Sequence, residues 1–238
     1  MKTLPTAALI LLVASFARAQ SDPALVDAVK NGDIAGLKAK LAAGADLGAK
    51  DQYGWTATMW AAGHSDAATL KTLLDKGGDP APKDPAGYSA MIEAAKGGRA
   101  GNIPLLAAKG LDCSAKDDLG VPALAYAATV SDPAVSALIA CGAKVNARDG
   151  NGLTALIRAA QLGRATAINL LVAAKAKVDA KDKSGFTALM WAAHGGWSDA
   201  VKALLAAQAD PTLKARDGRS ARDIATSRGR DDAAALLP

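Results

Sequence analysis

Two histidines, His64 and His194, are the side chains of this chain best suited to acid–base or metal chemistry. Each stands alone in the sequence, and we expect both to serve as hydrogen-bonding loop residues. Glu93 is the sole glutamate, and the aspartates fall at turns and helix starts. No Gly-x-Ser-x-Gly, His-Glu-x-x-His or phosphate-loop motif occurs. We therefore expect no catalytic residue, no metal site and no cofactor.

Cys113 and Cys141, the only cysteines, could form a disulfide. Such bonds persist in oxidising compartments. Cys113 takes a position that Val145 and Val178 fill in later segments, so the alternative is a buried thiol at Cys113 and an unrelated surface thiol at Cys141. Both readings stay open, because a sequence does not fix the Cα separation that a disulfide requires.

A repeat of 33 residues determines where these side chains lie. A glycine followed by a Thr/Ser-Ala pair, or by Pro-Ala in one unit, recurs at Gly54, Gly87, Gly120, Gly152, Gly185 and Gly218, with spacings of 33, 33, 32, 33 and 33. A second marker keeps the same spacings at Gly44, Gly77, Gly110, Gly142, Lys175 and Gln208. Two markers that hold one period over six units indicate a repeat architecture.

Each unit predicts a turn, a short helix, a loop and a second helix. The Asp51–Gly54 segment has the Asp-first, Gly-fourth preference of a type I turn. Thr56 can cap a first helix over about 57–62. Leu70, Leu73 and Leu74 give the apolar spacing of a second helix. A left-handed residue ends that helix, which suits Gly77 but would strain Lys175 and Gln208 at the equivalent positions.

These units resemble the ankyrin repeat. The family's Thr-Pro-Leu-His stretch corresponds to Thr56–Met59 and Thr187–Met190 in this chain. Its Gly-Ala-Asp-Val-Asn stretch corresponds to Gly142–Asn146. The resemblance covers residues 22 to 238 and implies an all-α ankyrin-repeat solenoid of about seven helix-turn-helix units, including two caps. It also implies a protein-binding module.

The repeat pattern divides the chain into a signal peptide over 1–19 and an ankyrin repeat domain over 20–238. Within that domain we expect an N-terminal cap over 22–49, inner repeats over 50–214 and a more polar C-terminal cap over 215–238. Pro104 falls inside a second helix, Pro122 replaces a capping Thr, and the unit that follows is one residue short. Residues 98 to 133 are therefore the predicted weak seam of the stack.

Aromatic residues are few, only 4% of the chain, and most fall at recurrent positions. In ankyrin-like geometry, residues beside the repeat glycine lie on the projecting finger, and the first helix lines the concave side. We expect a row of aromatic partner-binding residues there, since Tyr and Trp dominate binding hot spots; packing between repeats is the alternative. The candidates are Tyr53, Trp55, Trp60, Tyr88, Tyr126, Phe186 and Trp191.

A basic residue precedes the finger aspartate in successive units, at Lys50, Lys83, Lys116, Arg148 and Lys181. We expect these side chains to coat a solvated face, because exposed charges contribute little individually. A partner with an acidic strip could still use them.

The N-terminus carries the pattern of a secretory signal. Lys2 is followed by an apolar stretch from Leu4 to Phe16 and by Ala17–Ala19, which suits cleavage after Ala19. Removing Lys2 and Arg18 with it would lower the net charge from +5 to +3, too weak a bias to indicate nucleic acid. We expect a periplasmic or secreted protein that is not held in a membrane after cleavage.

Composition agrees with a folded helical protein. The chain of 238 residues is 50% hydrophobic and 21% charged, which excludes a disordered chain and disfavours a β-sandwich or barrel. We expect a monomeric, non-catalytic scaffold that binds another protein through its concave face and finger tips. The alternatives are an accessory protein that stabilises an exported enzyme and, less favoured, a small-molecule binder or enzyme.

Overall fold

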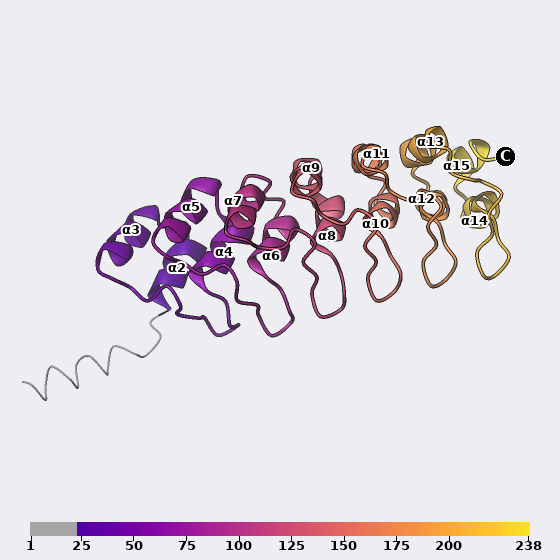
Figure 1. Cartoon of the computed structure of the whole chain (residues 1–238). Helices are drawn as coiled ribbons and strands as arrows, with labels where there is room; N and C mark the ends of the chain where they lie inside the picture. The colour runs from indigo at the N-terminus through magenta and orange to yellow at the C-terminus, as the bar shows by residue number, and fades with distance from the viewer. Residues whose placement is uncertain (1–22) are drawn as a thin grey trace, which may run out of the picture.

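The computed structural model describes residues 23–238, so the predicted signal peptide over 1–19 lies outside the described residues. The described chain forms fourteen helices in seven consecutive pairs, which stack side by side into an elongated solenoid (Figure 1). The predicted all-α solenoid of about seven units is confirmed. The pairs are α2 (Ala24–Lys30) with α3 (Ile34–Ala42), α4 (Ala57–His64) with α5 (Ala67–Asp75), α6 (Ala90–Lys96) with α7 (Asn102–Ala108), α8 (Ala123–Val130) with α9 (Asp132–Ala140), α10 (Ala155–Gln161) with α11 (Ala165–Ala173), α12 (Ala188–Gly195) with α13 (Ser198–Ala206), and α14 (Ala221–Ser227) with α15 (Asp231–Ala235).

Side-chain caps set the start of most first helices, as the sequence predicts. A Thr or Ser oxygen accepts the backbone N–H three residues ahead, at 3.2–3.4 Å, in α4, α6, α10, α12 and α14. This bond satisfies one of the amides that the first turn leaves without a partner. In α8 the capping position is Pro122, which has no side-chain acceptor, and the helix begins without such a cap.

The core lies between two rows of helices. First helices pack on first helices from α2 to α14, and the second helices form the outer row, with contacts from α5 to α15 (Figure 1). Alanines such as Ala61 and Ala94 are fully buried in the first row and allow the backbones to approach closely. A side chain on Gly97 would overlap the carbonyl of Gly63 in the preceding unit. Fully buried leucines such as Leu70 fill the space between the rows, each worth about 1.5–3 kcal/mol.

Every second helix except α15 ends in a left-handed residue. Lys175 has φ 67° and Gln208 has φ 63°, so these two side chains do take the conformation that glycine adopts elsewhere. A non-glycine residue there costs roughly 1–2 kcal/mol relative to its preferred backbone. The register of the repeat therefore outweighs the local preference of these two residues.

The helix pair that contains Pro104 departs from the others. Helix α7 has seven residues, whereas the second helices of the neighbouring units, α5 and α9, have nine, and it begins at Asn102. Pro104 thus falls in the first turn, where its missing N–H removes no intrahelical bond. The buried amide of Asn102 donates to the carbonyls of Ala61, Ala62 and Ser65, which ties α7 to the preceding unit.

Six hairpin fingers project from one edge of the helix rows, one between each pair and the next (Figure 1). Isolated bridges join Lys50 to Thr56, Lys83 to Ser89 and Lys116 to Pro122. Within residues 23–238, no helix is long and apolar enough to cross a bilayer.

Candidate binding face

Each finger has two chemically different sides. Lys50 pairs across the hairpin with Thr56, and neighbouring residues of an extended strand point to opposite sides. Asp51 and Trp55 therefore share the side opposite to Lys50. We call the side of the fingers and first helices that bears Tyr53, Trp55, Trp60, Tyr88, Tyr126, Phe186 and Trp191 the aromatic face. The basic face is the opposite side of the fingers, which bears Lys50, Lys83, Lys116, Arg148, Lys181 and Lys214.

A buried aspartate organises the aromatic face in the first finger. Asp51 Oδ1 accepts the backbone N–H of Tyr53 at 2.9 Å and of Trp55 at 3.0 Å, while Oδ2 accepts the indole N–H of Trp60 at 2.9 Å. Burial acts to raise the pKa of Asp51, but these donors and the charge of Lys30 outweigh it and lower the pKa. The carboxylate thus fixes both the turn and the ring that follows on the first helix.

The same arrangement recurs in the third, fourth and fifth fingers, each with a donor nine residues after the aspartate. Tyr126 donates to Asp117 at 2.7 Å, Arg158 to Asp149 at 2.7 Å and Trp191 to Asp182 at 2.9 Å. In the second finger Glu93 occupies that place and cannot donate when ionised. Trp55 of the preceding finger donates to Asp84 instead, at 2.9 Å.

The first aromatic cluster contains Tyr53, Trp55 and Trp60. The two indole rings lie 4.8 Å apart, and Lys30 Nζ lies 4.8 Å from the Trp60 ring and 5.8 Å from the Tyr53 ring. The ring of His64 lies 4.9 Å from that of Trp60. Tyr53 is 58% exposed, and it lines a hollow of about 560 Å³ together with Trp55, Trp60 and Pro85.

The hollow lies where a backbone bond between finger tips is missing. Later fingers are linked at their tips by a backbone bond, as from the Gly150 N–H to the Leu119 carbonyl at 3.1 Å and from the Lys183 N–H to the Asn151 carbonyl at 3.0 Å. Pro85 occupies the equivalent donor position in the second finger and has no N–H to give. Among the described residues, no such bond joins the first two tips.

A second cluster joins two neighbouring units. The Tyr88 and Tyr126 hydroxyls are 3.3 Å apart, and Lys96 Nζ lies 3.8 Å from the centre of the Tyr88 ring. Lys96 also pairs with Glu93 at 2.9 Å. Burial and the bond to Asp117 raise the pKa of Tyr126 far above its ordinary value, so the hydroxyl stays a donor.

A third cluster lies near the C-terminal end. The rings of Phe186 and Trp191 are 5.2 Å apart, and His194 lies 5.5 Å from Trp191. Burial, followed by the charges of Arg228, Arg230 and Arg219, lowers the pKa of His194. The neutral imidazole is therefore favoured beside the indole ring.

The structure thus places the seven predicted aromatic residues in three clusters rather than in one unbroken row. The unit between the second and third clusters presents the Arg158–Asp149 ion pair in place of a ring. Tyr53 is exposed, and the other six side chains are half-buried and take part in packing or hydrogen bonding between elements.

Sequence reasoning missed the polar partners of these rings. Lys30, His64, Lys96 and His194 each pack on an aromatic side chain. Helical spacing could have identified the histidines, since His64 follows Trp60 by four residues and His194 follows Trp191 by three. The two histidines belong to separate clusters at distant parts of the stack (Figure 1).

Several basic residues of the fingers also form hydrogen bonds to the next finger. Lys116 Nζ donates to the Arg148 carbonyl at 2.8 Å, Arg148 to the Lys181 carbonyl at 2.8 Å, and Lys181 Nζ to the Lys214 carbonyl at 2.9 Å. Each of these three cations therefore joins its finger to the next while it remains on the solvated face.

Cys113 and Cys141 are paired as a disulfide in the structure, with Cα atoms 6.1 Å apart. That separation lies within the usual range for the bond. Cys113 follows α7 and Cys141 follows α9, so the disulfide joins two adjacent units across the predicted seam. Among residues 23–238, no group of three or more His, Cys, Asp or Glu side chains is arranged to hold a metal ion.

A family model described as "Ankyrin repeats (3 copies)" matches residues 25–117, 103–182, 124–215 and 174–237. These overlapping matches cover nearly all of the chain that the structure describes. A comparison with curated proteins found no matching sequence.

Proposed function

Because the chain belongs to the ankyrin repeat family, whose repeats generally serve as protein–protein interaction scaffolds, we propose that it binds another protein through the aromatic face and the finger tips. We assign this face to the concave side of the stack. Binding here is equilibrium recognition by a preformed surface, without turnover, and the binding unit is the monomer.

The hollow at the first two fingers carries this proposal. It presents an exposed Tyr53 beside Trp55 and Trp60, which are held by Asp51 and Asp84, so the rings are already ordered before a partner arrives. Preorganised aromatic side chains lose little conformational entropy on binding and dominate hot spots. Pro85 has no N–H to give, so no backbone bond joins these two tips beside the hollow.

A photocrosslinking residue at position 53 would identify the partner in extracts of the source cells. Tyr53→Ala should then weaken binding of the purified partner by about tenfold or more, the loss expected of a hot-spot residue, without changing far-ultraviolet dichroism. Leu162→Ala is the matched control, because Leu162 is 51% exposed and lies in the loop between α10 and α11. Equal affinity of Tyr53→Ala and the parent protein would refute the proposed face.

We also propose that the protein is exported to the periplasm or the cell exterior. The charged start, apolar stretch and Ala17–Ala19 site support this, and so does a disulfide, which oxidising compartments maintain. Mass spectrometry of the protein recovered from its native compartment should give a chain that begins at Gln20 with no alkylatable thiol. A chain that retains Met1 and two free thiols would contradict export.

A further inference from the structure

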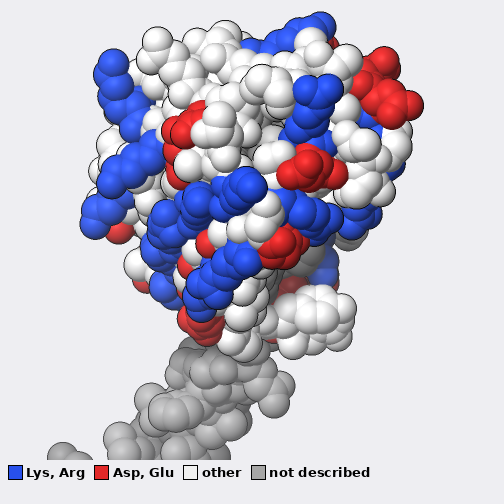
Figure 2. All heavy atoms as spheres, turned by 90° about the vertical axis from the view of Figure 1, so that its right-hand side faces the viewer, with Lys and Arg blue, Asp and Glu red and all other residues white. Residues whose placement is uncertain are grey.

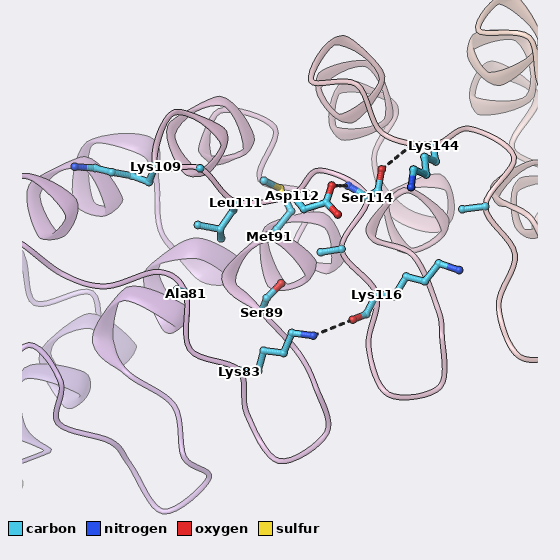
Figure 3. Close-up of a pocket in the computed structure, with 13 residues that line it drawn as sticks. Ala81, Lys83, Ser89, Met91, Lys109, Leu111, Asp112, Ser114, Lys116 and Lys144 are labelled. Atoms are coloured by element: carbon cyan, nitrogen blue, oxygen red, sulfur yellow. Dashed lines mark hydrogen bonds between the residues drawn. The ribbon is translucent and has the colours of Figure 1, made fainter.

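The basic face contains a second hollow, separate from the aromatic clusters. It has a volume of about 780 Å³ and lies between the finger that begins at Lys83 and the finger that begins at Lys116 (Figure 3). Its apolar lining lacks aromatic rings and includes the side chains of Leu111, Ala81 and Ala115. Such a lining suits an aliphatic side chain.

Four lysines line this hollow: Lys83, Lys109, Lys116 and Lys144. Asp112 is the one carboxylate in the lining, and its Oδ1 accepts the N–H of Ser114 at 2.7 Å. All four lysines are exposed, and none forms an ion pair within the part of the chain that the structure describes. The lining is therefore strongly cationic, with little internal compensation.

Two of these cations are held in place by the stack itself. Lys83 Nζ donates to the Lys116 carbonyl at 3.5 Å, and Lys116 Nζ donates to the Arg148 carbonyl at 2.8 Å. An ammonium group has three N–H donors, so each retains two for a ligand. The row continues through Arg148 and Lys181 along the fingers. In the end-on view, basic side chains gather over the fingers with acidic ones between them (Figure 2).

The spacing of this row fits an extended chain. Packed helices lie about 8–10 Å apart, so successive units place one cation about every 10 Å. Three residues of extended polypeptide span about 10 Å. A segment with a carboxylate at every third position would thus meet one cation per unit. Single-stranded nucleic acid is disfavoured, because such ligands need aromatic stacking platforms and the rings lie on the opposite face.

We propose that the basic face binds an extended acidic segment of a partner protein, with an aliphatic side chain in the hollow beside Leu111 and Ala115. This site is independent of the aromatic face and would persist if that face proved inactive.

The test measures binding of a fluorescent synthetic peptide of four Asp-Leu-Ser triplets to the full mature chain. A peptide with Asn in place of Asp serves as the uncharged control. The acidic peptide should bind with an affinity that falls as salt increases, and the Asn peptide should not bind. The double variant Lys109→Glu/Lys144→Glu should weaken binding about tenfold or more, since it reverses two charges that carry no bond between fingers.

Two control variants make the result specific. Lys38→Glu/Lys202→Glu changes two exposed lysines on α3 and α13 and should leave affinity unchanged apart from a small long-range effect. Tyr53→Ala should also leave it unchanged, which separates this site from the aromatic face. The proposal would be overturned if the acidic peptide failed to bind or if both double variants lost affinity equally. It would also be overturned if a single-stranded oligonucleotide of the same charge bound more tightly than the peptide.

Discussion

The indole N–H of Trp60 donates to Asp51 Oδ2 at 2.9 Å, and the same two atoms are 2.9 Å apart in Trp191 and Asp182. In these two units the aspartate that folds the finger thus also holds the first helix that follows it. One carboxylate couples the turn to the helix, so the aromatic face is ordered by the same group that shapes the finger.

Removing this indole donor should destabilise the stack. Trp191→Phe keeps an aromatic ring beside Phe186 but leaves one oxygen of a largely buried carboxylate without its donor. We expect the free energy of unfolding to fall by about 1–2 kcal/mol, as measured by urea denaturation. Trp197→Phe is the control, because Trp197 is 43% exposed and donates to a neutral carbonyl. An equal loss in both variants would show that ring size, not the bond to Asp182, matters.

The disulfide should stabilise the middle of the solenoid. Cys113 and Cys141 close a loop with a sequence separation of 28. Loop-closure entropy for that length corresponds to about 3–4 kcal/mol. Without reductant, the variant with both cysteines replaced by Ser should melt at a lower temperature than the parent protein. Its melting temperature should be roughly that of the parent protein after reduction. A reductant should not change the melting temperature of the variant. An unchanged melting temperature of the parent protein on reduction would contradict this prediction.

Stability should decrease as the pH falls below the ordinary histidine pKa. Burial and nearby arginines hold the pKa of His194 below 6.5, and burial also lowers that of His64. The unfolded chain therefore binds protons first, so the contribution of the two histidines to stability is constant above about pH 7 and declines as pH falls through 6.5 toward the folded-state pKa values.

Urea midpoints between pH 7.5 and 5.5 measure this loss. The variant His194→Gln should show a shallower dependence than the parent protein. Ring-proton titrations by NMR should place both histidines below a model peptide; values above it would reverse the sign and refute the argument.

Hydrogen exchange should be fastest, among the inner repeats, over residues 98 to 133. Helix α7 is shorter than its neighbours and α8 begins without a side-chain cap. These losses lower the local free energy of opening, which exchange measures directly. The segment from 165 to 206 provides the comparison, and uniform protection of both segments would exclude a seam. Reduction of the disulfide should widen the difference.

Much of the fold follows from local chemistry that the sequence displays. The period, the capping Thr and Ser residues and the Asp-x-x-Gly turns each act within one unit, so they can be recognised without knowing how units stack. Thr56 caps α4 as predicted, and Lys175 does adopt a positive φ. Local rules succeed here because each contact closes within a few residues.

The site was less predictable because its contacts cross from one unit to the next. The bond from Lys116 to the Arg148 carbonyl depends on the distance between fingers, which no single unit encodes. At Asp84 the donor is Trp55 of the preceding unit, so this bond can be predicted only when two units are considered together. The division of the aromatic residues into three clusters likewise arises from the units between them, as at Arg158.

The bonds that link neighbouring fingers have a consequence for the length of the rod. From Lys83 onward, each finger supplies a cation and the next supplies a main-chain oxygen, so every junction is equivalent to the one before it. Copying one internal unit would recreate both halves of the junction without any further substitution. Gene duplication can therefore lengthen this protein one unit at a time. The junction between the first two fingers, at Pro85, lacks the bond from a cation to a carbonyl and would not be recreated in this way.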